Sequence, residues 1–346
     1  MVKRRQVQRH TQRQKTGARR SAERPPLPPG VKIAIVPTVG TDGRVPKAAQ
    51  PRPTELMFLH IWVLTQEREF DSEEELQAFL SPYMSPGEKP QFPEPTQLWH
   101  KAQDLAYQGW ETKSAQKRRK IAQQVLEISA DAPDGYLLLA HDAASWQEAA
   151  QLCTQAVTAA WRLMGPDPFE AYVGGGFWGA AITRPYMRAR LALGYALWRQ
   201  GERAEAQAHF QELLRLNPGD NQGVRYLLVA VLLEQGQDAE AERLMRRYSE
   251  DAFCFWAYNR ALGYFRQRGD HPAARRQLER ARARNSYVPA LLLSLRPMRV
   301  GELAIVEPGG LSEAQEYRQL YYDAWAMTSG ALEWLKQVAA PSPKGG

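Results

Sequence analysis

Residues 183–218 read TRPYMRARLALGYALWRQGERAEAQAHFQELLRLNP, and this pattern predicts one helix–turn–helix unit. Gly194 and Ala206 are small, which lets the two helices approach closely, and Phe210 fills the space one turn further on. Gly201 can adopt the left-handed backbone conformation that ends a helix. A unit of this size cannot bury its apolar face alone, so the sequence also predicts neighbouring units.

The same landmarks return further along the chain. A glycine followed by an alanine five residues later occurs three times, at intervals of 35 and 33 residues: Gly201 and Ala206, Gly236 and Ala241, Gly269 and Ala274. This period is typical of the tetratricopeptide repeat, whose helix pairs stack into a solenoid. We therefore predict an all-α fold, a tetratricopeptide-repeat-like helical solenoid with an irregular N-terminal extension and C-terminal capping helices.

Composition divides the chain into five regions. They are a disordered basic tail (1–24), a proline-rich irregular region with one or two short helices (25–96), the solenoid of about five helix pairs (97–295), a loop with capping helices (296–338) and a disordered end (339–346). In the second region, Glu55–Thr65 is expected to be helical, and Ser72 with Glu75 resembles a capping box. The run VKIAIV at 31–36 is compatible with a short strand or an extended segment.

The positive charge is concentrated at the N-terminus. Residues 1–24 carry nine basic side chains against one acidic, a net +8, so the other 322 residues carry −1 of the total +7. The basic side chains proposed to contact a partner are Lys3, Arg4, Arg5, Arg9, Arg13, Lys15, Arg19 and Arg20. Such a tail attracts phosphates with little regard to base sequence, so nucleic acid is a candidate partner. A transit peptide and a solubility tail without a ligand are the alternatives.

Three sequence blocks resemble a particular group of proteins. They are GGFWGAAITRPYMRAR (175–190), LRLNPGDNQGVRYLL (214–228) and DAWAMTSGALEWL (323–335). The chain resembles, over roughly residues 70–338, bacterial tetratricopeptide-repeat proteins related to the family named after a suppressor of tumorigenicity. The resemblance implies the repeat fold and an interaction role, and it provides no catalytic residues.

Arginines and aromatic residues of the repeats are the candidate binding residues. The residues predicted to line the concave groove and bind a partner are Arg184, Arg188, Tyr195, Arg225, Trp256, Asn259 and Arg260. Arg184 and Arg188 follow a loop that offers backbone donors at 174–176 and the Trp178 ring, so an anionic peptide or carboxylate could be held there. The alternative is that these arginines pair with acidic side chains of neighbouring helices.

Signatures of catalysis are missing from the sequence. The six histidines show no HExxH pattern and no metal-ligand spacing with Cys153 or Cys254, which we expect to be buried thiols in preference to a disulfide. No run approaches the roughly 20 apolar residues of a membrane span. We predict a non-enzymatic, cytoplasmic scaffold or adaptor that binds a protein or peptide, without cofactor, metal or membrane. A nucleic-acid-associated factor is the alternative, and an enzyme with a site in the 165–190 loop is a third hypothesis.

Overall fold

The computed structural model describes residues 43–52, 54–65, 68–84, 92–172, 176–294 and 306–339. All regular elements within these ranges are helices, which confirms the all-α solenoid. The basic tail, the VKIAIV segment and residues 340–346 lie outside the described residues.

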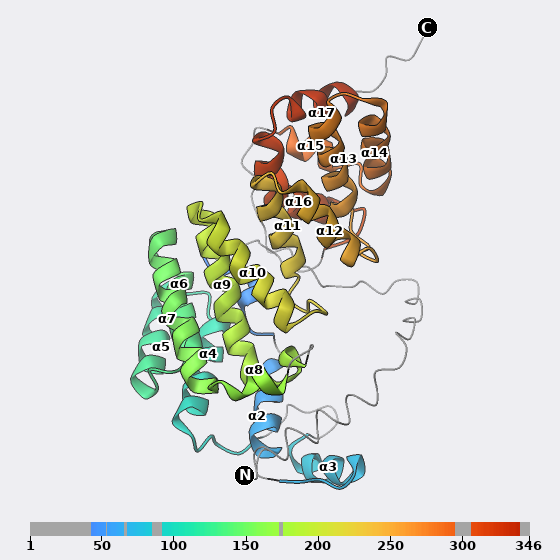
Figure 1. Cartoon of the computed structure of the whole chain (residues 1–346). Helices are drawn as coiled ribbons and strands as arrows, with labels where there is room; N and C mark the ends of the chain where they lie inside the picture. The colour runs from blue at the N-terminus through green and yellow to red at the C-terminus, as the bar shows by residue number, and fades with distance from the viewer. Residues whose placement is uncertain are drawn as a thin grey trace.

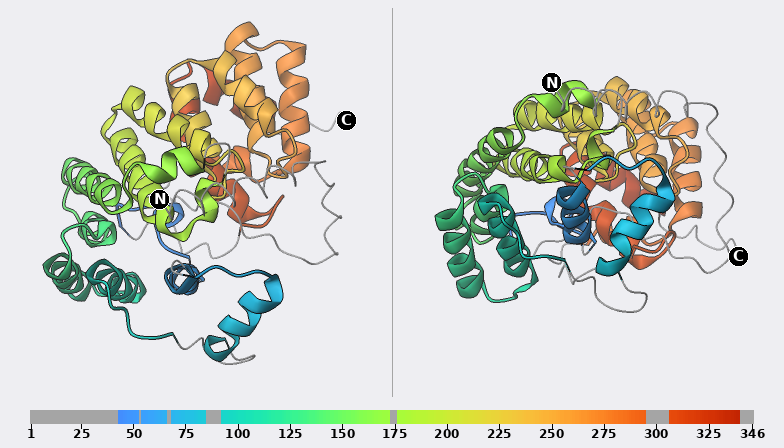
Figure 2. Two further views of the ribbon diagram at one scale, coloured as in Figure 1. Left: turned by 60° about the horizontal axis from the view of Figure 1, so that its bottom comes forward. Right: turned by 90° about the horizontal axis from the view of Figure 1, so that it is seen from below.

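Five helix pairs form the body of the chain (Figure 1). They are α4 (Leu98–Glu111) with α5 (Ala115–Ile128), α6 (Pro133–His141) with α7 (Trp146–Met164), α9 (Arg184–Gln200) with α10 (Arg203–Leu216), α11 (Val224–Glu234) with α12 (Asp238–Arg247), and α13 (Phe255–Arg268) with α14 (Pro272–Arg284). Seen from below in Figure 2, these pairs follow an arc, and α2 (Glu55–Thr65) lies inside its curve with helices from the C-terminal part.

The third pair has the close helix contact that its small residues predict. A Cβ atom added to Gly194 would lie 2.8 Å from Phe210 Cε1, and both Ala206 and Phe210 are fully buried. Gly201 ends α9 with a φ of 94°, in the left-handed region that suits glycine. The helices α9 and α10 therefore pack at a distance that a larger residue at position 194 would not allow.

An irregular insertion connects α7 to α9. It contains α8 (Asp167–Ala171) and two short 3-10 helices, η3 (Phe177–Gly179) and η4 (Ala181–Thr183). The buried Phe177 ring packs 5.2 Å from Phe169 and 6.2 Å from Tyr186, measured between ring centres. This aromatic contact fixes the insertion on the first turn of α9.

The described residues of the N-terminal region contain two longer helices and two short 3-10 helices. The helix α2 spans the predicted Glu55–Thr65, and its Leu59 packs with Ala181 of η4. The helix α3 (Glu73–Leu80) begins at Ser72, whose hydroxyl accepts a hydrogen bond from the Glu75 amide at 3.1 Å, as the capping motif predicts. The 3-10 helices are η1 (Lys47–Ala49) and η2 (Ser81–Tyr83).

The C-terminal helices do more than cover the end of the solenoid. After the short α15 (Val288–Leu292), α16 (Leu311–Ala326) packs against α11, while α17 (Ala331–Ala339) packs against α13 and α15. Fully buried aromatic residues of α16 meet the repeats: the Tyr317 ring lies 5.7 Å from Phe255, and the Tyr321 hydroxyl donates to the Tyr226 carbonyl at 3.2 Å. The chain therefore fills this part of its own groove.

Candidate functional site

The predicted groove residue Arg188 is buried inside the protein. Its guanidinium contacts Glu55 of α2, and it donates to the Asp134 carboxylate of α6 at 2.5 Å. Gln103 and Trp110 of α4 donate to the same carboxylate at 2.6 and 3.1 Å. This network joins four helices, and Arg188 has no surface on which to bind a partner.

Burial dominates the electrostatics of this network. It raises the pKa of Asp134 to about 6, while hydrogen bonds from Gln103 and Trp110 oppose the rise. Burial also lowers the pKa of Arg188 to about 9. An arginine that remains charged at neutral pH and sits between two buried carboxylates is a structural group, because each charge there depends on the others for compensation.

Two more predicted groove residues, Asn259 and Trp256, are buried. Asn259 is 1% exposed, and its side-chain oxygen accepts a hydrogen bond from Tyr317 of α16 at 3.0 Å. Trp256 is also buried, with its indole nitrogen donating to the Tyr248 carbonyl at 2.9 Å. Among the described residues, the buried side-chain nitrogen of Asn259 makes no hydrogen bond. Both side chains are buried within the chain, and α16 covers Asn259.

The remaining predicted residues differ in their exposure. Tyr195 is buried, and its ring packs against the edges of Trp146 and Trp198. Arg225 is half-buried and pairs with both Asp220 and Asp251 at 2.9 Å.

Asp220 also accepts hydrogen bonds from the first amides of α11, which is the role of a helix N-terminal cap. Arg260 is partly exposed and pairs with Glu242 at 3.0 Å.

Arg184 lies in a different environment. Its guanidinium carbon lies 5.1 Å from the centre of the Trp178 ring and 5.2 Å from that of Phe58. A second guanidinium, that of Arg52, lies 5.3 Å from the same Trp178 ring. We call Arg52, Phe58, Trp178 and Arg184 the arginine–tryptophan patch.

Neither guanidinium of the patch pairs with a carboxylate among the described residues. Arg184 donates to the Trp178 carbonyl at 3.2 Å, and Arg52 donates to the Asn221 carbonyl. Partial burial lowers the pKa of both arginines, and the charge of Arg184 lowers that of Arg52 further. The two guanidinium cations repel each other beside aromatic faces, so a bound anion would stabilise both of them.

The position of Arg184 at the start of α9 strengthens the attraction of the patch for an anion. Arg184 is the first residue of a 17-residue helix, whose N-terminus carries partial positive charge. Arg52 is exposed and Trp178 is half-buried, so the patch can be reached from solvent. Of the loop donors that the sequence suggested, residues 174 and 175 lie outside the described residues.

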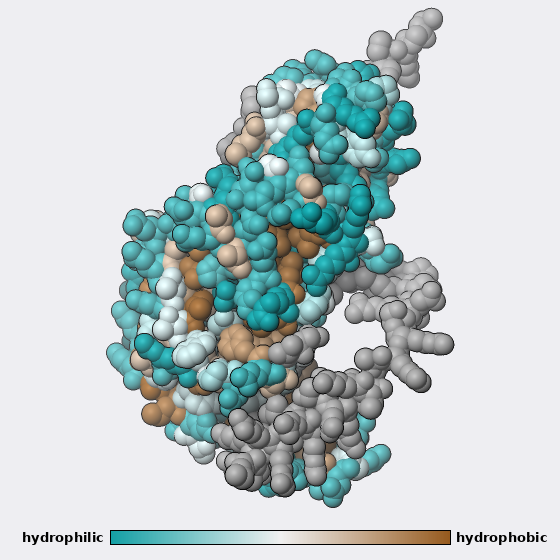
Figure 3. All heavy atoms as spheres, viewed as in Figure 1, coloured by the Kyte–Doolittle hydropathy of each residue, from teal (hydrophilic) through white to brown (hydrophobic). Residues whose placement is uncertain are grey.

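A shallow groove of about 640 Å³ lies elsewhere, between the third and fourth helix pairs. Its lining comprises Gln211, Leu214, Arg215, Pro218, Leu228, Leu232, Glu240, Arg243, Leu244 and Arg247. Arg215 and Arg243 pair with Glu212 and Glu240 of their own helices, so these two charges are already compensated. On the face shown in Figure 3, hydrophobic side chains gather in strips between helices, and hydrophilic ones cover most of the rest.

Comparison with known protein families gives two matches, both described as tetratricopeptide repeat. One covers residues 197–253 and the other covers residues 258–280. The chain contains tetratricopeptide repeats. No curated protein matched the chain, and no solved structure matched it.

The matched repeats run from the end of α9 to α14 and include most of the segment with regular glycine and alanine spacing. Tetratricopeptide repeats generally serve in binding between proteins and act as non-catalytic scaffolds. Among the described residues, no helix is long and apolar enough to cross a membrane. Cys153 and Cys254 are both buried free thiols.

Sequence reasoning found Arg184 and Trp178 and missed Arg52 and Phe58. The last two lie before the tetratricopeptide repeats, in a region that we expected to be mostly irregular. Arg52 hydrogen bonds to a residue 169 positions later in the chain, and no local pattern predicts such a contact. The helical pattern of Glu55–Thr65 was a signal that this region folds onto the repeats.

Proposed function

We propose that this protein is a non-catalytic scaffold that binds an acidic segment of a partner protein at the arginine–tryptophan patch. One observation carries the proposal: two guanidinium groups face the Trp178 ring without a carboxylate partner among the described residues. A carboxylate side chain or a C-terminal carboxylate would complete the charge pairing with bidentate arginine hydrogen bonds.

The patch differs from the groove that the sequence suggested. Arg188, Trp256 and Asn259 are buried among residues of the chain itself, so binding through them would require α2 or α16 to move. Arg184 and Arg52 can take a ligand without such a change. We also propose, on the sequence blocks alone, that the chain is related to the suppressor-of-tumorigenicity group.

The test compares the proteins that the immobilised full chain retains from a cell extract, identified by quantitative mass spectrometry. We expect Arg184→Glu and Arg52→Glu to lose the same set of acidic partners while melting like the wild type. Arg243→Glu is the control, because Arg243 is an exposed arginine on α12 away from the patch. Retention of the same set by all four proteins would contradict the proposal.

A second proposal, nucleic-acid binding, is supported by the net +8 charge of residues 1–24. Phosphate contacts of this kind weaken steeply with salt. A chain that begins at Pro25 should therefore lose most of the affinity for mixed-sequence RNA and DNA that the full chain shows at low salt. Equal affinity of the two chains would exclude the tail as the binding segment.

A further inference from the structure

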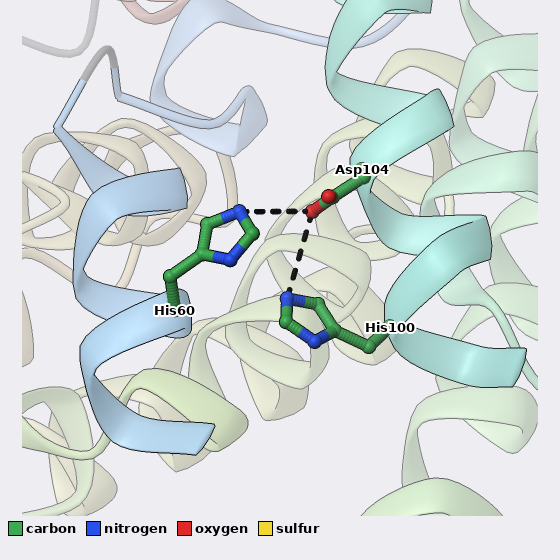
Figure 4. A group of neighbouring side chains, drawn as sticks. All are labelled: His60, His100 and Asp104. Carbon is green, nitrogen blue, oxygen red and sulfur yellow. Dashed lines mark ion pairs between the residues drawn. The ribbon is translucent and has the colours of Figure 1, made fainter. Parts of the chain in front are cut away.

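Three polar side chains converge where α2 meets α4 (Figure 4). His60 comes from α2, and His100 and Asp104 lie one turn apart on α4. The Nε2 atom of His60 lies 3.3 Å from Asp104 Oδ1, and the Nε2 atom of His100 lies 3.6 Å from the same oxygen. Two imidazole nitrogens and one carboxylate oxygen therefore point at one common space.

The buried atoms of this cluster lack hydrogen-bond partners. His100 Nε2 and Asp104 Oδ1 are both shielded from solvent, and neither makes a hydrogen bond. The side chain of His100 is 3% exposed. Buried polar atoms without a partner are costly, so such a pair calls for a ligand. Among the described residues, the ion-pair partners of Asp104 are these two imidazoles and no lysine or arginine.

The geometry suits a small metal ion. Zinc bonds of about 2.0–2.1 Å place tetrahedral ligand atoms about 3.3–3.4 Å apart. The two measured separations from Asp104 Oδ1, 3.3 and 3.6 Å, are close to that value. All three ligand atoms lie within 4.8 Å of one another, so the two imidazole nitrogens need to approach by at most about 1.5 Å to reach the tetrahedral spacing.

Aromatic neighbours hold the rings in this orientation. The His60 ring stacks on Phe92 with 4.8 Å between ring centres and 2° between planes. The His100 ring stacks on Trp99 at 5.4 Å and 27°. Because both rings are held by such contacts, part of the entropic cost of arranging the ligands is met by the fold itself.

We propose that His60, His100 and Asp104 bind a divalent transition-metal ion, with Zn²⁺ the best match to two nitrogens and one carboxylate oxygen. Mg²⁺ and Ca²⁺ prefer oxygen ligands throughout and should bind poorly. The Asp104 side chain is 25% exposed, so water can complete the coordination. The ion joins α2 to the first helix pair, and it thereby holds Phe58 of α2 in place beside Arg184.

The test uses the full chain without a histidine tag, stripped of metal with EDTA and titrated with ZnCl₂ by calorimetry. We expect one equivalent to bind, a rise in melting temperature, and visible absorption of four- or five-coordinate Co²⁺ when CoCl₂ replaces zinc. MgCl₂ should give neither heat nor stabilisation. His60→Ala, His100→Gln and Asp104→Asn should each lower Zn²⁺ affinity at least about tenfold. His271→Asn is the control, because His271 is exposed and caps α14, a role that asparagine also fills.

Hydrogen exchange separates this proposal from a folding defect in the variants. In the wild type, Zn²⁺ should slow amide exchange in α2 and α4 and leave α12 unchanged, whatever the stability of the variants. Absence of saturable Zn²⁺ binding by the wild type would overturn the proposal. So would unchanged affinity in all three ligand variants, or protection by Zn²⁺ that appears only outside α2 and α4.

Discussion

Replacement of Arg188 by methionine tests whether this residue is a structural group or a binding group. The substitution keeps an unbranched stem of similar volume and removes the guanidinium. It leaves Glu55, which is 2% exposed, and Asp134, which is 0% exposed, without the cation between them. Breaking a buried ion pair by removing one partner costs about 3–5 kcal/mol. Asp134 keeps its bonds from Gln103 and Trp110, which hold the expected loss within that range.

The loss should depend on pH in a defined direction. Burial already raises the pKa of Asp134 to about 6, and loss of the neighbouring guanidinium removes a charge that favours the ionised form. An acid whose pKa is higher in the folded state destabilises the fold as the pH rises through that pKa. The deficit of Arg188→Met should therefore be largest above pH 6 and shrink as the pH falls to 5.

Urea unfolding followed by circular dichroism measures both effects. Adding Glu55→Gln and Asp134→Asn to Arg188→Met removes both stranded charges, so the triple variant should recover at least half of the lost stability. High salt should change little, because the network is buried. A decrease in the free energy of unfolding below about 1 kcal/mol, together with lost partner binding, would refute the reasoning. Arg188 would then be a binding residue of the groove.

Three further substitutions test the packing and titration of the body, each by urea unfolding. Trp325→Ala should cost about 3–5 kcal/mol, because this fully buried ring of α16 leaves a cavity in the filled groove; a small loss would show that α16 detaches easily. Gly194→Ala should cost about 1–3 kcal/mol through its clash with Phe210, and a neutral result would mean that α9 and α10 can separate. Burial, and then the charge of Arg190, lowers the pKa of His209 to about 4, so its contribution to stability is complete above about pH 6.5 and is lost as the pH falls through 4. His209→Gln should reduce the fall in stability between pH 7 and 4.5 by about 1 kcal/mol, allowing for partial exposure, and an unchanged pH profile would contradict this assignment.

The sequence predicts the parts of the fold that repeat. Gly201, Gly236 and Gly269 mark turns at a nearly constant spacing, and each is followed by an alanine that is fully buried. Such signals are local, since one helix pair contains all the residues that define it. The five pairs, the start of α3 at Ser72 and the cap at Asp220 follow from contacts within a few residues.

The candidate site depends on contacts that the sequence does not display. Arg188 pairs with Glu55, which lies 133 positions earlier in the sequence, and with Asp134, which lies 54 positions earlier. A concave position in a repeat predicts exposure only if nothing else fills the groove, and here α2 and α16 do so. The histidine cluster could not be predicted from the sequence for a similar reason. His60 comes from a region without repeats and lies 40 residues before His100.

The two ends of the described chain make this solenoid different from an open one. The helix α2 supplies Glu55 to Arg188, and α16 supplies Tyr317 to Asn259, so side chains that an open groove would present to a ligand are instead in contact with other parts of the chain. A peptide that displaced either helix would have to replace buried ion pairs or buried aromatic contacts before it gained any affinity. The recognition that we propose at the arginine–tryptophan patch would avoid that cost, because Arg52 and Arg184 lie against Trp178 and lack a carboxylate partner among the described residues. With Arg188 and Asn259 covered by α2 and α16, Arg184 at the start of α9 is the predicted groove arginine that lacks a carboxylate partner among the described residues.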